Sequence, residues 1–481
     1  MKIIIKKTIT LIILALTVFT VNAQWSTPIS LGNGLFKSLA SGDSFVHMAN
    51  GSGTITYRRS IDEGTTWSSP TTIGNGTIYL DRPICMDGLN VYIVYFRDFV
   101  TVTDWCCPRN LGNMYMRKSN DGGTTWQPEV QLTTTQGGYR VGIISSGSNV
   151  YLTWMDFRSG TTWDLYFRKS TDGGVTWQPE YVLVAGNNSV GAERPDIVVK
   201  DSTVHVLWMS AFNNLPPCYT MPNCSEVFYK RSLDYGTSWG PDTKLNTTPA
   251  YAARPIATLT GSNTVIVSWE GEDGTGENEP YTRRSTDNGT TWDSVQQWRN
   301  LLGEASHQFV ASLGGTVHLA WHDERDSANK EIYYRASNDS GATFAAEELV
   351  SNAPGESAVP ILGTTTNYVH AIWSDDRSGS SKPWYSRRGI SATTSVPNVS
   401  NLLTNLKVYP NPAQEIFTVE FSHENYDLII TDLTGRNIFE KKNVSGQTEI
   451  SSKDFPNGIY FIEAISNKVR IKIKKLISII K

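Results

Sequence analysis

Hydrophobic and polar residues alternate along most of this chain, in short runs rich in aromatic and β-branched residues. Six runs begin with Val and end in an aromatic residue, at 91–95, 150–154, 204–208, 265–269, 317–321 and 369–373. A period of two residues over short segments is typical of β-strands with one buried face. Turn-forming residues separate the runs, so the pattern predicts an all-β protein.

One short signature recurs between these runs: Ser-x-Asp-x-Gly-x-Thr or Ser, followed by Trp or Phe. Its six copies are Ser60–Trp67, Ser119–Trp126, Ser170–Trp177, Ser232–Trp239, Ser285–Trp292 and Ser337–Phe344. A repeat of this period indicates one supersecondary unit stacked many times. Ser and Asp can hold a tight turn by bonding to nearby amides, so we interpret the aspartates as structural. They are Asp62, Asp121, Asp172, Asp234, Asp287 and Asp339.

Each repeat is interpreted as four strands, with the signature as the turn between the third and fourth. A seventh copy, without the signature, spans 359–388 and lacks a fourth strand. The segment from Trp25 mirrors the one from Trp67, so we expect the N-terminal strand to complete the last blade and close a ring. The prediction is a seven-bladed β-propeller over residues 24–392, with six blades as the alternative.

The signature is the Asp-box of the bacterial neuraminidase repeat, and the chain resembles sialidase-like β-propellers. The resemblance implies a glycan-active protein in which three arginines clamp an acidic sugar. The chain departs from that family at 35–39, where Leu-Phe-Lys-Ser-Leu replaces the expected Arg-Ile-Pro strand. We also assign no residues of this sequence to the paired Tyr and Glu that form the family's nucleophile.

The two ends of the chain have different compositions from the middle. Residues 1–23 have a lysine-rich head, an apolar run and a small-residue cleavage site, which predicts a secretory signal peptide. Residues 393–401 are interpreted as a linker. Residues 402–481, with the Pro-Asn-Pro at 410–412 and a basic end, resemble the type A sorting domain of the type IX secretion system of Bacteroidetes. This resemblance implies a small β-sandwich, the secretion machinery as a partner, and a secreted or surface-exposed protein.

Net charge and cysteine content limit the classes of partner, cofactor and compartment that suit this chain. Residues 24–401 hold 28 basic and 37 acidic residues, a net charge of −9, which argues against nucleic acid. The five cysteines, Cys85, Cys106, Cys107, Cys218 and Cys224, suit an oxidising compartment. No nucleotide or redox cofactor motif is present, and only calcium is kept as a candidate. We expect a monomer without a transmembrane segment after signal removal.

Strand direction alternates within a blade, so the start of strand one and the loop after strand two share the face opposite the signature turns. This face is expected to carry the site. The candidate ligand-binding residues there are Arg82, Arg140, Arg194, Arg254, Trp105 and Phe212. Guanidinium groups bind carboxylate or sulfate bidentately, and aromatic rings suit sugars. An alternative is that these arginines pair with aspartates across blade interfaces.

The candidate acid–base residues lie nearby: Glu270, Glu272 and Asp273 in an acidic loop, and His307 at a strand start. Paired carboxylates suit glycoside hydrolysis, and a histidine suits proton transfer. Two hypotheses follow. One is an extracellular enzyme on anionic glycans, either a sialidase-like hydrolase or a polysaccharide lyase. The other is a non-catalytic propeller that binds glycan or protein.

Overall fold

The computed structural model describes residues 24–34, 37–79, 81–103, 108–187, 190–212, 225–247, 251–261, 263–272, 277–298, 303–325, 329–390, 407–420, 426–432, 436–444, 446–466 and 471–479. The chain divides into two compact units, Met1–Ser391 and Ala392–Lys481. Every regular element found in these ranges is a β-strand, which confirms the all-β prediction.

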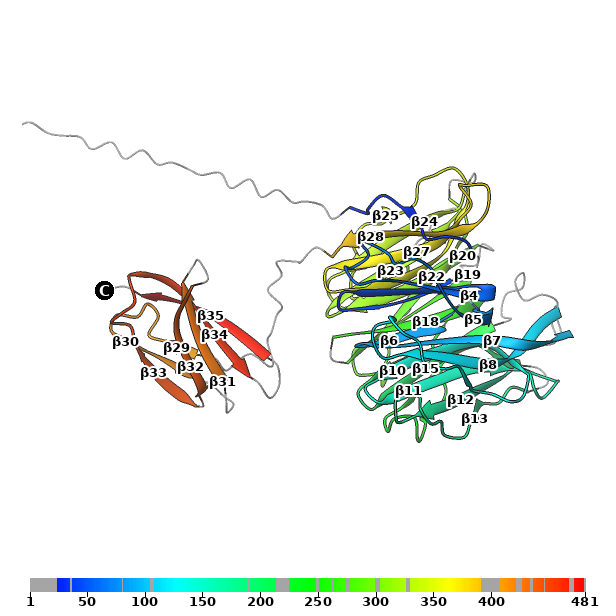
Figure 1. Ribbon diagram of the computed structural model, residues 1–481, viewed down its shortest axis with the longest axis horizontal. Coiled ribbons are helices and arrows are strands. Elements are labelled where there is room, and N and C mark those ends of the chain that lie inside the picture. The colour runs from blue at the N-terminus through cyan, green and yellow to red at the C-terminus, as the bar shows by residue number, and fades with distance from the viewer. Residues whose placement is uncertain are drawn as a thin grey trace, which may run out of the picture. The chain divides into compact units, whose positions relative to one another are not determined.

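The described strands of the first unit pair into seven antiparallel sets of four, which we call blades 1 to 7 (Figure 1). Blade 1 holds β2 Lys37–Gly42, β3 Phe45–Asn50, β4 Ser52–Ser60 and β5 Thr71–Thr77; blade 2, β6 Ile84–Asp87, β7 Asn90–Thr103, β8 Pro108–Ser119 and β9 Val130–Gln131; blade 3, β10 Gly138–Ser146, β11 Asn149–Asp156, β12 Asp164–Ser170 and β13 Tyr181–Val184; blade 4, β14 Val190–Lys200, β15 Thr203–Phe212, β16 Ser225–Ser232 and β17 Thr243–Lys244.

The remaining sets follow the same order. Blade 5 holds β18 Ala252–Thr260, β19 Thr264–Glu272, β20 Asn278–Ser285 and β21 Gln296–Gln297; blade 6, β22 Ala305–Leu313, β23 Thr316–Asp323, β24 Glu331–Ser337 and β25 Glu348–Leu349; blade 7, β26 Ser357–Thr364, β27 Tyr368–Asp375, β28 Lys382–Gly389 and the N-terminal β1 Ile29–Ser30. Single residue pairs, Thr77 with Phe96 and Gly112 with Gly138, also join blades 1, 2 and 3.

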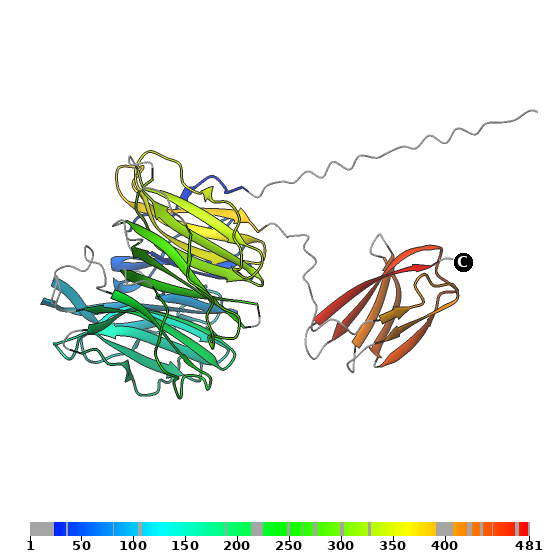
Figure 2. The ribbon, with the colours of Figure 1, turned by 180° about the vertical axis from the view of Figure 1, so that it is seen from behind.

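The blades form a closed ring. The first strands of neighbouring blades lie side by side, from β2 through β6, β10, β14, β18, β22 and β26 back to β2. The view from behind brings the green strands of blades 4 and 5 to the front (Figure 2). As expected, the N-terminal strand completes the last blade: Ile29 pairs with Tyr385, and Ser30 with Trp384. Closure removes the open sheet edges that would otherwise invite aggregation.

The hydrophobic core lies between blades. One cluster joins Tyr151 and Phe167 of blade 3 to Ile197 and Val206 of blade 4, and similar clusters recur around the ring. Strand two is buried along nearly its whole length, as in β11, β19, β23 and β27. This burial explains the aromatic residues that end the strand-two runs.

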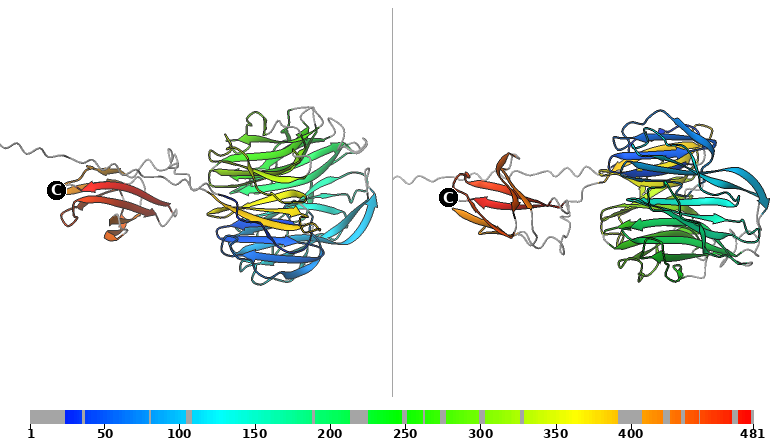
Figure 3. Two further views of the ribbon diagram at one scale, coloured as in Figure 1. Left: turned by 90° about the horizontal axis from the view of Figure 1, so that it is seen from above. Right: turned by 60° about the horizontal axis from the view of Figure 1, so that its bottom comes forward.

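Blade 2 departs from the repeat. Its strands β7 and β8 have 14 and 12 residues, and their ends extend beyond the other strands (Figure 3). The lengthened ends of β7 and β8 flank the loop between strands two and three, on the face predicted to carry the site.

The second unit contains two antiparallel sheets. One holds β29 Lys407–Tyr409, β30 Ile416–Glu420 and β33 Gln447–Ser451; the other holds β32 Asn437–Val444, β31 Tyr426–Asp432, β34 Gly458–Ser466 and β35 Ile471–Ile479. One hydrophobic core, with Phe417 and Ile430 among its members, joins the two sheets. The predicted signal peptide and linker lie outside the described residues.

Candidate active site

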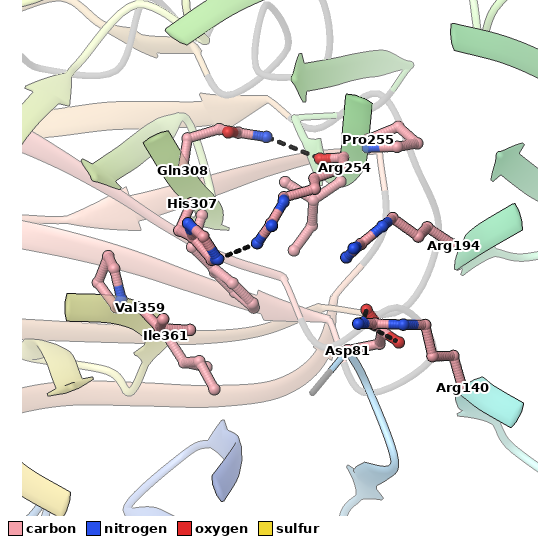
Figure 4. A pocket seen from close by; sticks show the side chains of 12 residues that line it. Asp81, Arg140, Arg194, Arg254, Pro255, His307, Gln308, Val359 and Ile361 are labelled. Atoms are coloured by element: carbon pink, nitrogen blue, oxygen red, sulfur yellow. Dashed lines mark hydrogen bonds and ion pairs between the residues drawn. The ribbon is translucent and has the colours of Figure 1, made fainter. Parts of the chain in front are cut away.

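A pocket opens where the first strands of the blades begin (Figure 4). It encloses about 580 Å³ of non-atom space, the open solvent at its mouth included. Residues from six successive blades line it, and we call the first lining residue of each blade a rim residue. The rim residues are Asp81, Arg140, Arg194, Arg254, His307 and Val359.

A shared backbone irregularity turns these side chains toward the pocket. From Arg140 to Val359, five rim residues have φ between 50° and 54°, and each lies at a register shift in its blade's first strand. A β-bulge of this kind re-aims a side chain at the cost of a strained backbone. The repeat therefore places the same backbone bulge in five blades, whereas the side chain is arginine in three of them, histidine in one and valine in one.

The rim is positively charged on one side. Arg140, Arg194 and Arg254 lie next to one another there (Figure 4). Arg140 Nη1 contacts both carboxylate oxygens of Asp81 at 3.2 Å. Burial raises the pKa of Asp81, and the three arginines act in the opposite direction. Asp81 contacts Arg140 and Glu270 contacts Arg254, so three arginines meet two carboxylates and one positive charge remains in excess, which suits an anionic ligand.

Arg254 links the arginine side of the pocket to His307. Its Nε lies 2.8 Å from Glu270 Oε1, and its Nη1 donates to His307 Nε2. Glu270 is almost completely buried, and its other oxygen accepts the backbone N–H of His307 at 3.0 Å. Glu270 therefore holds both Arg254 and the bulge at His307, which makes it a positioning residue rather than an exposed acid or base.

His307 is neutral in this environment. Burial lowers its pKa well below the ordinary value, and Arg254, His322, Arg194 and Arg140 lower it further. Its ring stacks on that of His322, with 4.8 Å between centroids. A neutral imidazole can accept a proton, but the lowered pKa also makes it a weak base, so His307 needs an anionic ligand beside the arginines to raise its proton affinity.

Hydrogen bonds fix which nitrogen of His307 faces the ligand. The Val359 N–H donates to His322 Nδ1 at 3.4 Å, so the His322 proton lies on Nε2 and points to Ser306 Oγ, 2.8 Å away. Ser306 Oγ also lies 3.2 Å from His307 Nδ1. Because Arg254 donates to Nε2, we assign the His307 proton to Nδ1. The lone pair of Nε2 then faces the arginines.

Four other buried histidines have a different role. Each shares a hydrogen bond of 2.6 to 2.7 Å with a tyrosine on the adjacent strand, in the pairs His47–Tyr57, His205–Tyr229, His318–Tyr334 and His370–Tyr385. Burial lowers their pKa values to about 3 or 4. These pairs pack between blades, away from the rim.

The structure separates Arg82 from the other predicted anion binders. Asp81 rather than Arg82 lies at the rim in blade 2. Arg82 instead lines a second cavity, enclosed by the first strands of all seven blades, which we call the central channel. There its Nε lies 3.2 Å from Asp196 Oδ1, and its Nη2 donates to the Ala257 carbonyl at 2.6 Å. This contact joins blades 2, 4 and 5, as in the cross-blade alternative considered from the sequence.

The remaining predicted site residues stay untested. Glu272 ends β19 but does not line the pocket. Asp273 and Trp105 lie outside the described residues, as do four of the cysteines. Phe212 ends β15, where it pairs with Val190. The fifth cysteine, Cys85, is a buried free thiol.

The signature turns are held by their own contacts. In all six, the Gly N–H donates to Ser Oγ at 2.8 Å, and Ser Oγ donates to Asp Oδ1 at 2.7 to 2.8 Å. Each turn also contacts the previous blade; for example, Arg59 Nη1 donates to the Gly122 carbonyl at 2.5 Å. The aspartates thus close turns and do not reach the pocket.

Sequence reasoning missed Asp81, Val359 and His322. The Arg-Pro pairs of blades 2, 4 and 5 look equivalent in sequence, but blade 2 is shifted by one residue at the rim. Val359-Pro360 occupies the place of Arg194-Pro195 and Arg254-Pro255, so the proline was the available signal for Val359.

No group of three His, Cys, Asp or Glu residues that could hold a metal ion occurs among the residues the structure describes. Four of the ten residues of the acidic loop considered for calcium, 273–276, lie outside them, so calcium remains a prediction. The described part of the chain also contains no helix of the length and apolarity needed to cross a membrane.

Comparison with solved structures supports the ring architecture. A polysaccharide lyase of a new family, an ulvan lyase, superposes with a TM-score of 0.55 at 10% identity, over 75% of this chain and 94% of that one. The same kind of enzyme bound to -[GlcA(1-4)Rha3S]- gives 0.53 at 10% identity and the same coverage. The first unit is a β-propeller. At these identities the likeness extends to the fold alone.

More distant structures include a Trypanosoma rangeli sialidase, with a TM-score of 0.36 and 12% identity, covering 54% of this chain and 55% of that one. This likeness is too weak to carry an argument. No curated protein matches the chain.

Residues 407–480 match the family model of the secretion system C-terminal sorting domain. The match falls within the second unit and confirms the resemblance noted from the sequence. A sorting domain of this kind indicates that the β-propeller is secreted and reaches the outer cell surface.

Proposed function

We propose that this secreted β-propeller binds an acidic sugar unit through its rim arginines and cleaves the glycan by β-elimination. The observation that carries the proposal is the meeting of three arginines and a neutral His307 at one pocket. The superposed ulvan lyases lend it support, since one of them holds a uronate and a sulfated sugar.

Arginine binding suits the first requirement of the reaction. The proton next to a carboxylate becomes acidic only when the carboxylate charge is neutralised, and bidentate guanidinium contacts provide that neutralisation. Arg140, Arg194 and Arg254 surround the space where such a carboxylate would lie. The same groups would bind a sulfate substituent.

His307 supplies the base. Its Nε2 takes the proton from the carbon next to the carboxyl group, and the C–H electron pair becomes a C=C bond. The bond to the glycosidic oxygen at the β position breaks, and this oxygen takes a proton from the imidazolium or from water. General base catalysis of this kind contributes about 10²–10⁴-fold.

Arg254 couples binding to the base. In the structure, Arg254 Nη1 donates to His307 Nε2 and occupies its lone pair. A ligand carboxylate attracts the same guanidinium, which releases Nε2 for proton transfer. The base is thereby exposed only when the substrate's acid is in place.

Hydrolysis by paired carboxylates has less support. A glycosidase of that type needs two carboxyl groups flanking the scissile bond. Among the described residues that line the pocket, Asp81 alone carries a carboxylate, and Arg140 holds it. Glu270 is buried behind Arg254.

Non-catalytic glycan binding is the second candidate. The repetition of one backbone bulge in five blades favours it, because similar positions around a ring suit recognition without chemistry. In that case the arginines keep their role and His307 only supports Arg254.

The test uses the full-length secreted protein with glycans that contain uronate, sulfate or sialic acid, with products read by mass spectrometry. An unsaturated uronate end is expected, lost by at least about 100-fold in His307→Ala. Arg194→Ala should abolish binding as well as cleavage, and Arg284→Ala, at the exposed pair with Asp293, is the matched control. Saturated products of hydrolysis, or free sialic acid, would contradict cleavage by β-elimination. Binding without products would establish the second candidate.

A further inference from the structure

We propose that Val359 selects a ligand with an apolar edge, either a methyl group or the C–H face of a sugar ring, on the side of the pocket opposite the arginines. This inference rests on the proposed function, because it describes the sugar unit held at the same pocket. It adds a second recognition element to the anion-binding one.

The pocket has two chemically different sides. Asp81 and the three arginines come from blades 2 to 5, and Figure 4 shows Arg140 and Arg194 on the side away from Val359 and Ile361. The apolar side is formed by Val359, Pro360 and Ile361 of blade 7, with Phe309 of blade 6. A ligand that fills the pocket must therefore present charge to one side and apolar groups to the other.

Val359 occupies a backbone conformation that valine disfavours. Its φ is 54°, in the left-handed region where a β-branched residue is a clear outlier. The following residue is Pro360, which biases its predecessor toward extended conformations and adds to the strain. Glycine or asparagine would adopt this conformation more easily.

The surroundings hold the strained backbone in place. The Val359 N–H donates to His322 Nδ1 at 3.4 Å, and His322 is itself fixed by Ser306. The same device holds His307, whose N–H donates to Glu270. In both cases a strand-two side chain of the preceding blade supports the rim residue of the next blade.

Packing alone does not explain the choice of valine. The Val359 side chain is half-buried and lines the pocket, so it is not part of the continuous core. Strain that persists at a pocket-lining residue points to function. The geometry assigns that function to contact with the ligand's apolar edge. A hydroxyl placed there would be desolvated among Val359, Pro360 and Ile361.

The first experiment compares binding of three sulfated sugars to the full-length protein by calorimetry. L-fucose sulfate carries a methyl group, L-galactose sulfate carries a hydroxymethyl group at that position, and D-arabinopyranose sulfate lacks the exocyclic carbon. Wild-type protein should prefer the methyl or the bare C–H edge to the hydroxymethyl by about tenfold, because a buried unpaired hydroxyl is disfavoured. Tighter binding of L-fucose sulfate than of D-arabinopyranose sulfate would indicate a methyl contact, and the reverse order would indicate a contact with the C–H face of the ring.

Two variants separate ligand contact from packing. Val359→Thr keeps the branched shape and the backbone strain but adds a hydroxyl, so the preference should fall to near unity with little change in melting temperature. Val359→Asn relieves the strain, so the melting temperature should rise while affinity for the preferred sugar falls about tenfold.

Three results would overturn the inference. Equal affinity of wild-type protein for all three sugars would remove the apolar selection and leave the anion site standing. A lower melting temperature in Val359→Asn with unchanged preference would make Val359 a packing residue. Failure of all three sugars to bind would contradict the anion site and the inference together.

Discussion

The signature turns and the pocket rim both recur around the ring, but the turns repeat their side chains and the rim repeats a backbone bulge. In the turns, sequence and contacts are nearly the same in six blades, and each polar group bonds within its own turn or to the neighbouring blade. At the rim, the backbone bulge is the same in five blades, whereas the side chain changes from arginine to histidine to valine. A repeated side chain stabilises the fold, and a repeated backbone with variable side chains can form one asymmetric site.

Among the variants that test this comparison, Gly123→Ala in a signature turn is expected to change the free energy of unfolding most. Gly123 has φ of 81°, and an added Cβ would lie 1.7 Å from the buried Tyr57 hydroxyl. Backbone strain and the clash should together destabilise the protein by about 3 kcal/mol, measured by denaturant unfolding.

Gly147→Ala is the matched control, because Gly147 has φ of 59° with nothing within 4 Å of an added Cβ. It should lose only about 1 kcal/mol, the backbone penalty alone. Equal losses in the two variants would mean that the turns do not lock neighbouring blades through Tyr57.

A smaller effect is expected from Lys37→Met near the start of β2. Lys37 is completely buried, its amine donates to Ser374 Oγ at 2.7 Å, and burial lowers its pKa to about 7. The unfolded chain binds the proton more tightly, so stability should rise between pH 7 and about 10.4, the unfolded value. Below pH 7 both states are protonated and the full burial penalty remains.

Methionine removes the buried charge without a large change in volume. The variant should be more stable than wild type by about 2 kcal/mol at pH 7 and below, and the gain should shrink toward pH 10. Unfolding measured across this pH range tests it. A pH-independent difference would show that Lys37 is not the titrating group.

The smallest effect is expected from Asp62→Asn in the first signature turn. Hydrogen bonds from Thr66 and Ser60 lower the pKa of Asp62 to about 2, against burial, which acts the other way. The charged form therefore contributes stability above the unfolded pKa of about 3.9, and this contribution is lost as pH falls toward 2.

The Asp62→Asn variant should lose about 1 kcal/mol at neutral pH and nothing near pH 2, measured by unfolding at several pH values. The acid-induced loss should persist in part, because five other turns titrate similarly. A constant difference between pH 7 and pH 2 would argue that the amide, rather than the charge, explains the change.

Much of the fold could be predicted because local signals agreed with the tertiary arrangement. The alternating runs, the signature turns and the resemblance between Trp25 and Trp67 placed the strands and the closing β1. Of the predicted site residues, Arg140, Arg194, Arg254 and His307 come together at one pocket with Glu270 behind them. Spacing within the repeat was sufficient for those residues.

The rest of the site could not be predicted from spacing. A shift of one residue in blade 2 exchanges Asp81 for Arg82 at the rim and moves Arg82 to Asp196 in the channel. Val359 carries no chemical signal, since its importance lies in a backbone angle. Glu270 looked like an exposed acid in an acidic loop, but its burial behind Arg254 makes it a support.

The sequence by itself determined the β-repeat, the turn at each signature and the sorting domain at the end of the chain, because each depends on neighbouring residues or a contiguous segment. Only the tertiary structure decided which side chains meet. Closing the ring brings six strand starts from residues 81 to 359 to one pocket, and bulges in five of these strands turn the side chains inward. Charge, burial and proton positions at this pocket follow from contacts between blades, which no local pattern specifies.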